Sequence, residues 1–194
     1  SAVGKRTTAQ ILTNAFINSG MKTELIGTGQ TAWMQGVKYG LILDSLVNDF
    51  VSGEIEHVVH TCWENEKPSV IILEGQGSLL NPAYPGGFEL MAAGRPDAII
   101  LQHAPARKEY DGFPGYKIHD LYKQIKAIET ISGKPVIALT INHENLTKKE
   151  LDKQMSFIST SYDLPTYDVL LNGADNLIKT IMKHKVKIKK DVKF

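Results

Sequence analysis

The sequence predicts a three-layer α/β fold, in which a parallel β-sheet is covered by helices on both faces. Short apolar segments alternate with longer amphipathic segments along the 194 residues, as expected when each strand is followed by a helix. The segments Ser-Val-Ile-Ile-Leu at 69–73 and Asp-Ala-Ile-Ile-Leu at 97–101 are almost wholly apolar, which is typical of parallel strands buried on both faces. These observations together predict one parallel sheet of at least five strands.

The individual elements follow from the spacing of apolar residues and from the residues that end each segment. Apolar residues near helical spacing predict helices, and glycine or a polar cluster ends several of them. In chain order we expect a helix at 7–19, a strand at 22–26, a helix at 43–66, strands at 69–73 and 97–101, a helix at 117–131, a strand at 135–140, a helix at 145–159, a strand at 168–171 and a helix at 174–184. Within the second helix, Ser52-Gly53 is expected to break or bend the chain.

The composition limits the classes of partner. Hydrophobic residues make up 42% and charged residues 22% of the chain, and the net charge is +1, so no global field favours nucleic acid or a membrane surface. No apolar run approaches the roughly 20 residues that a membrane helix needs. The single cysteine, Cys62, excludes an internal disulfide and suits a reducing compartment. We therefore expect a cytoplasmic protein with a small-molecule substrate and no nucleic-acid or membrane partner; a homo-oligomer is left open.

The segment most informative about function is the first turn. A Gly-Lys pair stands before the first helix, where a glycine lets backbone N–H groups curl around phosphate oxygens and the helix directs its positive end at them. The pair predicts a P-loop. The expected fold is therefore a three-layer arrangement like that of P-loop NTPases. The expected phosphate-binding residues are Ser1, Ala2, Val3, Gly4, Lys5, Arg6, Thr7 and Thr8. The alternative is an ordinary helix cap beside a surface lysine.

The start of the chain bears on the domain organisation. A P-loop ordinarily follows a buried strand, and none precedes Gly4-Lys5 in these residues. We expect residues 1–194 to be a single P-loop α/β domain, the C-terminal part of a longer chain, whose first strand lies upstream.

Arg6 is a departure from the usual P-loop motif. The position after the lysine ordinarily carries Ser or Thr, whose hydroxyl holds Mg²⁺, and here Thr7 and Thr8 follow one position late. One position is a turn of about 100° on a helix, so neither threonine inherits the metal role. An arginine can neutralise phosphate directly, and we expect no bound metal.

The loop at 27–31 and the long loop at 74–87, each of which follows a predicted strand, supply further candidates. Glu74 follows the apolar segment at 69–73, where a carboxylate commonly holds Mg²⁺ or positions a water molecule opposite a phosphate loop; it is a candidate catalytic residue. Glycines in both loops let the backbone approach a ligand closely. The expected substrate-binding residues of these loops are Gly29, Gln30, Thr31, Gln76, Gly77, Ser78 and Tyr84. The alternative for both loops is a plain turn.

His103, after the strand at 97–101, is the second candidate catalytic residue. Its unperturbed pKa lies near neutrality, which suits a general base. The alternative is an ordinary hydrogen-bonding histidine. Asn142 stands after the strand at 135–140, where some P-loop proteins read a base.

These segments resemble a known family. The first eight residues, Gly-Thr-Gly-Gln-Thr at 27–31, Asp-Phe-Val-Ser-Gly at 49–53, Glu-Gly-Gln-Gly-Ser-Leu at 74–79 and Asn-Pro-Ala-Tyr at 81–84 occur in this order. The same order is found in the C-terminal domain of a family long catalogued as of unknown function, which includes D-glutamate N-acetyltransferases. The resemblance covers most of residues 1 to about 134, and residues 74–84 are its most specific part. The fold is also similar to that of dethiobiotin synthetase, whose loop ends in Gly-Lys-Thr.

The resemblance implies a domain organisation and a reaction. Family members usually carry a Rossmann-like N-terminal domain, which is expected upstream. The implied reaction moves acetyl from acetyl-CoA to the amino group of an acidic D-amino acid such as D-glutamate, with acetyl-CoA as the cofactor. The first alternative is an ATP- and Mg²⁺-dependent ligase or kinase-like enzyme related to dethiobiotin synthetase. The second is a non-catalytic nucleotide-binding module.

Overall fold

The computed structural model describes residues 3–82 and 86–191, with side chains described as far as residue 185. Its strands form two three-stranded sheets in which every pair of neighbours is parallel. The first sheet has the order β2 (Tyr39–Gly40), β1 (Thr23–Gly27), β3 (Val70–Leu73). The second has the order β4 (Ile99–His103), β5 (Val136–Ile141), β6 (Thr166–Tyr167). The predicted α/β class with parallel strands is confirmed.

The division into two sheets differs from the single sheet that was expected. Within residues 3–82 and 86–191, β3 pairs with β1 alone and β4 pairs with β5 alone. The sheets are joined through the helices that pack over both of them, because one apolar cluster contains Val70 and Ile72 of β3, Ile100 of β4 and Ala138 of β5. Residues of β3 and β4 thus pack in one apolar cluster although the two strands do not pair.

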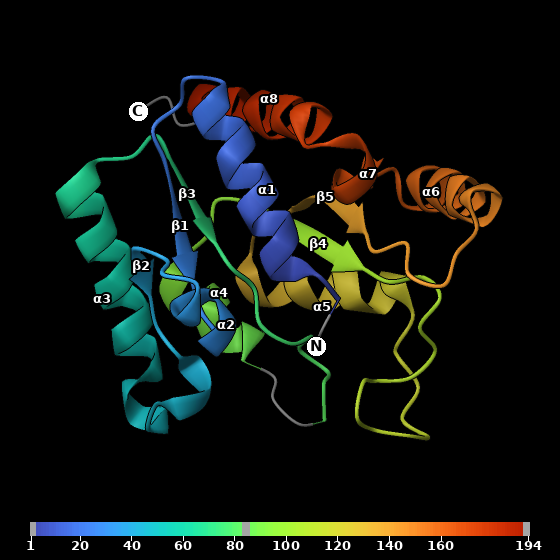
Figure 1. The fold of residues 1–194 in the computed structure, drawn as a ribbon, viewed down its shortest axis with the longest axis horizontal. Coiled ribbons are helices and arrows are strands. Elements are labelled where there is room, and N and C mark those ends of the chain that lie inside the picture. The colour runs from blue at the N-terminus through green and yellow to red at the C-terminus, as the bar shows by residue number, and fades with distance from the viewer. Residues whose placement is uncertain (1–2, 83–85, 192–194) are drawn as a thin grey trace.

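Helices cover both faces of the sheets (Figure 1). The helices are α1 (Lys5–Asn18), α2 (Gln30–Met34), α3 (Asn48–Glu66), α4 (Gly87–Gly94), α5 (Leu121–Ser132), α6 (Lys148–Tyr162), α7 (Val169–Asn172) and α8 (Asp175–Asp191), with a short 3-10 turn at Leu43–Ser45. On one face α1, α7 and α8 share a core with Leu12, Phe16 and Leu177 at its centre. On the other, α3 and α4 pack on the first sheet, and α5 and α6 pack on the second.

The predicted strand at 168–171 is wrong. Residues Val169–Asn172 form helix α7, and the strand lies earlier, at Thr166–Tyr167. The Asp168 carboxylate accepts hydrogen bonds from the backbone N–H groups of Leu170 and Leu171, both at 3.1 Å. These bonds satisfy donors that a helix start leaves free, so the apolar Val-Leu-Leu run begins a helical turn.

Other boundaries and short elements also differ from expectation. Helix α5 begins at Leu121 instead of 117, because the Asp120 side chain caps it by accepting from the Lys123 N–H at 2.8 Å. Helix α3 runs through Gly53 without the expected break. Three elements lie where neither a helix nor a strand was predicted: α2, β2 and α4.

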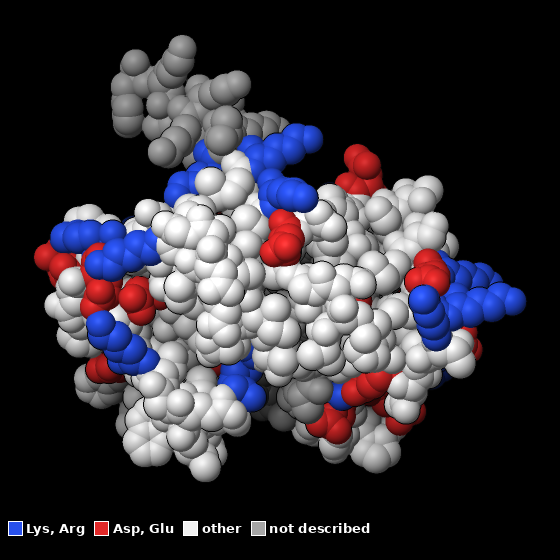
Figure 2. All heavy atoms as spheres, turned by 45° about the horizontal axis from the view of Figure 1, so that its top comes forward, with Lys and Arg blue, Asp and Glu red and all other residues white. Residues whose placement is uncertain are grey.

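The surface shows no large field of one sign on the face in Figure 2. Lys, Arg, Asp and Glu side chains are scattered around its edges, and the middle is largely uncharged (Figure 2). Among the described residues, no helix combines the length and apolar character needed to cross a bilayer.

Candidate functional site

The predicted phosphate loop begins helix α1 with a left-handed turn. Gly4 precedes the first residue of the helix and has φ +88° and ψ +14°, a conformation that glycine adopts without steric cost. The Gly4 carbonyl accepts the Thr8 N–H at 3.0 Å, and Gly4 is exposed. The turn presents the free N–H groups at the start of α1 to an incoming anion. Ser1 and Ala2, expected in the same loop, lie outside the described residues.

Lys5 runs from this turn across the loop that follows β3. A Cβ atom placed on Gly75 would lie 3.5 Å from Lys5 Cδ, so the lysine stem passes against the Gly75 backbone. Burial lowers the pKa of Lys5; Arg107 adds to this by repulsion, and attraction to Glu74 opposes it. The ammonium group is thus a partly desolvated cation whose charge a bound anion would stabilise.

Glu74 is held in a compact network at the ends of β1 and β3. It is 8% exposed, and its Oε2 accepts the Thr28 N–H at 3.2 Å. Burial raises its pKa, and the Thr28 bond and the nearby charges of Arg6 and Lys5 oppose that rise. The Thr28 hydroxyl donates to the Glu74 carbonyl at 3.1 Å. A buried carboxyl group with a raised pKa beside a phosphate loop is suited to exchanging protons.

Gln76 ties the loop after β1 to the loop after β3. Its Nε2 donates to the Thr28 carbonyl at 2.7 Å and contacts the Thr28 hydroxyl at 2.9 Å. A Cβ on Gly29 would lie 3.5 Å from the same nitrogen. Gly29 precedes α2, and Gln30 and Thr31 are exposed at the start of that helix. The structure therefore brings together the three segments around Lys5, residues 27–31 and residues 74–76.

The other predicted residues of the loop after β3 are less closely tied to Lys5. Gly77 and Ser78 continue this loop and are half-buried. The Ser78 hydroxyl is buried and finds no hydrogen-bond partner among the described residues. Tyr84 lies outside the described residues.

The end of β4 reaches the first turn of α1 through Gln102. Its Oε1 accepts the Thr8 hydroxyl at 2.7 Å and the Thr140 hydroxyl at 2.6 Å, so Thr8 is engaged with the second sheet. His103, the last residue of β4, is half-buried, and burial lowers its pKa to about 4. Thr7 is exposed.

Arg6 points toward helix α2. Its guanidinium donates to the side-chain carbonyl of Gln35, and it is close enough to Glu74 to favour the ionised carboxylate. Arg6 therefore lies on the α2 side of the phosphate loop, with one guanidinium nitrogen bonded to Gln35.

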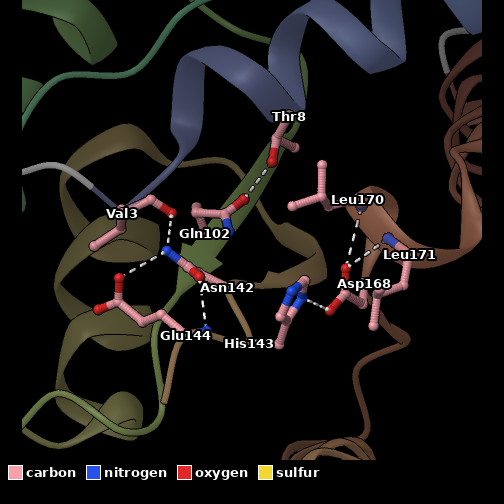
Figure 3. Close-up of polar contacts among 9 residues, drawn as sticks. All are labelled: Val3, Thr8, Gln102, Asn142, His143, Glu144, Asp168, Leu170 and Leu171. Atoms are coloured by element: carbon pink, nitrogen blue, oxygen red, sulfur yellow. Dashed lines mark hydrogen bonds and ion pairs between the residues drawn. The ribbon is translucent and has the colours of Figure 1, made fainter. Parts of the chain in front are cut away.

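A second group of polar residues lies beyond β5 (Figure 3). Asn142 donates from Nδ2 to the Val3 carbonyl at 3.3 Å and accepts the Glu144 N–H at 2.9 Å. Glu144 forms a two-pronged ion pair with Arg107, whose Nη2 lies 3.0 Å from Glu144 Oε2. Asn142 thereby fixes the chain just before Gly4-Lys5 to the end of the second sheet.

His143 and Asp168 form a pair that sequence reasoning missed. His143 Nδ1 lies 2.5 Å from Asp168 Oδ2, and Asp168 is fully buried (Figure 3). A usable signal existed, since Asp168 before Val-Leu-Leu is a helix-capping residue. The strand predicted at 168–171 concealed that signal. No group of three or more His, Cys, Asp or Glu residues suited to a metal ion is present in the described part of the chain.

The fold and this loop define a P-loop domain, in which residues 3–8 join the ends of two parallel sheets. Residues 1–178 match the family described as "Domain of unknown function (DUF1611_C) P-loop domain". The chain belongs to this family.

Relatives with a curated description and a solved structure agree with that placement. A D-glutamate N-acetyltransferase of Tritonibacter scottomollicae is 27% identical over 186 residues, and one of a Pseudoalteromonas species is 25% identical over 190 residues. Each match covers 93% of this chain and 55% of the relative, so the chain spans about half the length of these proteins. The crystal structure of a DUF1611 family protein from Anabaena variabilis ATCC 29413 matches with a TM-score of 0.86 at 27% identity. That match covers 94% of this chain and 54% of the other.

Proposed function

We propose that this domain is the donor-binding part of an N-acetyltransferase. The enzyme would move acetyl from acetyl-CoA to the amino group of an acidic D-amino acid such as D-glutamate. The observation that carries the proposal is the convergence of Lys5 with Glu74 and Gly75 beside the Gly4 turn. The reaction class is supported by two relatives that are described as D-glutamate N-acetyltransferases and that each match 93% of this chain.

The phosphates of coenzyme A are the part of the donor that this loop suits. A pyrophosphate accepts hydrogen bonds from the N–H groups at the start of α1 and gains from the positive end of that helix. Lys5 adds one cation, partly buried at the same turn. Arg6 lies on the α2 side of the loop, and Arg107 is near enough to lower the pKa of Lys5. These cations favour binding of the phosphates without a metal ion, although Arg107 is also paired with Glu144.

Acyl transfer also needs a group that removes a proton from the attacking amine. Glu74 is one candidate, since its raised pKa lies closer to neutrality than that of an exposed carboxylate. Burial lowers the pKa of His103 to about 4, so its side chain is neutral at pH 7. It can therefore accept a proton only against the cost of a buried positive charge.

An ATP- and Mg²⁺-dependent ligase is the second candidate function. The observation in its favour is Glu74 at the carboxyl end of β3 beside Lys5, a place where P-loop enzymes hold Mg²⁺ or a water molecule. Against it, Arg6 replaces the usual hydroxyl residue, and the Thr8 hydroxyl is committed to Gln102.

Calorimetry on the full-length protein separates the candidates. Acetyl-CoA, ATP with Mg²⁺ and ADP are titrated side by side, and thiol release is then followed with D-glutamate and with L-glutamate as the matched control acceptor. Our proposal expects acetyl-CoA to bind tightest and D-glutamate to release thiol. Preference for ATP with Mg²⁺, with no thiol release, would favour the ligase. Binding without turnover of any acceptor would favour a non-catalytic nucleotide-binding module.

A further inference from the structure

His143 and Asp168 have a geometry that the predicted candidates Glu74 and His103 lack. The Asp168 carboxylate is fully buried and accepts at both oxygens, from two backbone N–H groups at Oδ1 and from His143 at Oδ2. These contacts fix the position of the carboxylate at the start of α7. In the tautomer that donates Nδ1–H to this carboxylate, the imidazole lone pair lies on Nε2.

The His143 imidazole is partly exposed. The His143 side chain is 30% exposed, and no hydrogen bond to Nε2 is found in the described part of the chain. His143 directly follows Asn142, which contacts the Val3 carbonyl just before the Gly4 turn. Both residues follow β5; the Asn142 side chain points toward Val3, and the His143 ring points toward Asp168 at the start of α7 (Figure 3).

Given the acetyl transfer proposed above, on which this inference rests, we propose that His143 Nε2 is the base that deprotonates the acceptor amine, and that Asp168 positions it. The substrate ammonium first loses one proton to water. His143 takes a second proton as the nitrogen bonds to the acetyl carbonyl carbon. The C–S bond of the thioester then breaks, and the departing thiolate takes the proton from the imidazolium. One proton is released to solvent for each acetyl group transferred.

Asp168 is a positioning residue in this step. It holds the ring by its Nδ1–H and stabilises the imidazolium that forms, as carboxylates do beside catalytic histidines on other folds. His103 has no such partner among the described residues, and burial holds its pKa at about 4. The pair after β5 is therefore better suited to the proton transfer than the histidine after β4.

The test uses the full-length enzyme with acetyl-CoA and D-glutamate. We expect His143→Gln to lower kcat by at least about a hundredfold, in the range typical of a lost general base, while the acetyl-CoA affinity measured by calorimetry changes less than about threefold. Asp168→Asn keeps an oxygen to cap α7 and is expected to lower kcat by about tenfold or more. His60→Gln, on the exposed side of α3, is the matched control and keeps full activity.

Chemical rescue provides a readout that a structural defect would not give. Imidazole added to His143→Ala is expected to restore thiol release in proportion to its concentration, and it should have no effect on Asp168→Asn. Full activity in His143→Gln, or an inactive His143→Ala that imidazole does not rescue, overturns the assignment of the base and leaves the acetyl transfer standing. A wild-type enzyme that binds no acetyl-CoA and releases no thiol overturns the proposed function, and this inference falls with it.

Discussion

The stem of Lys5 lies against the backbone of Gly75, so that a methyl group at residue 75 would be 3.5 Å from Lys5 Cδ. This contact joins the first turn of α1 to the loop after β3, although 70 positions separate the two residues in the sequence. It places the lysine near Glu74, where burial lowers the pKa of Lys5 and attraction to the carboxylate opposes that shift.

Lys5→Ala is expected to weaken binding of the phosphate-bearing ligand more than tenfold and to leave the melting temperature nearly unchanged. Burial already disfavours the lysine charge, so its removal costs the unliganded fold little, whereas the ligand loses a cation at its phosphates. Calorimetry and thermal denaturation measure the two effects. Lys126→Ala, which removes an exposed cation on α5, is the control. A large fall in melting temperature with unchanged affinity would mean that Lys5 is structural.

Arg6 is expected to make phosphate binding nearly independent of Mg²⁺. Arginine cannot coordinate a metal, and Mg²⁺ usually takes a ligand from the residue after the P-loop lysine. Affinity for acetyl-CoA and ADP is compared in excess EDTA and in millimolar Mg²⁺. Arg6→Thr should acquire a metal dependence, and Arg6→Gln, which adds no hydroxyl, should not. Strong dependence on Mg²⁺ in the parent protein would contradict this expectation and favour the ATP-dependent ligase.

Gly27→Ala is expected to destabilise the protein by about 1–3 kcal/mol, the usual range for overpacking a core. The added Cβ would lie 2.5 Å from Ala32 Cβ and 3.0 Å from Val37 Cγ1, so β1 and α2 would have to separate. Gly53→Ala is the matched control. Its Cβ would meet nothing within 4 Å, and it lies inside α3, where alanine should add about 0.5–1 kcal/mol. Urea denaturation measures both variants, and equal stability of the two would contradict the close packing at Gly27.

His103 should make the protein less stable as the solution is acidified. The pKa of His103 is about 4 in the folded protein and near its ordinary value of 6.5 in the unfolded chain. The unfolded state therefore takes up the proton first, and the unfolding free energy falls as pH drops from 6.5 toward 4. Between about pH 7.5 and about pH 5 this loss is on the order of 2 kcal/mol.

The comparison with His103→Gln isolates that contribution. The variant should lose less stability than the parent over the same pH interval in urea denaturation, and His60→Gln, exposed on α3, should behave like the parent. Parallel pH profiles for the parent and His103→Gln would show that His103 titrates alike in both states.

The sequence was sufficient for the class of fold and for the places of the phosphate turn and of the loops after β1 and β3. Apolar runs and the Gly-Lys pair predicted where strands end and where the phosphate turn lies, because both depend on residues close together in the chain. Prediction failed where one side chain decided between two local structures. Asp168 converts an apolar run into a helix start, and Asp120 delays α5.

The remaining features of the site depend on packing between distant residues. Whether Arg6 turns toward Gln35, or Thr8 toward Gln102, is decided by side chains 29 and 94 positions away. The pairing of His143 with Asp168 spans 25 positions. Hydrophobic periodicity carries no information on such contacts.

The first turn of α1 and the residue before it contact groups that belong to both sheets. Lys5 lies against the loop after β3, Thr8 bonds to Gln102 on β4, and the Val3 carbonyl bonds to Asn142 after β5. An anion bound at this turn would touch groups carried by both halves of the molecule at once. Ligand binding would then also stabilise both sheets together, and hydrogen exchange in β3 and β4 would slow at once, far from the atoms that the anion contacts.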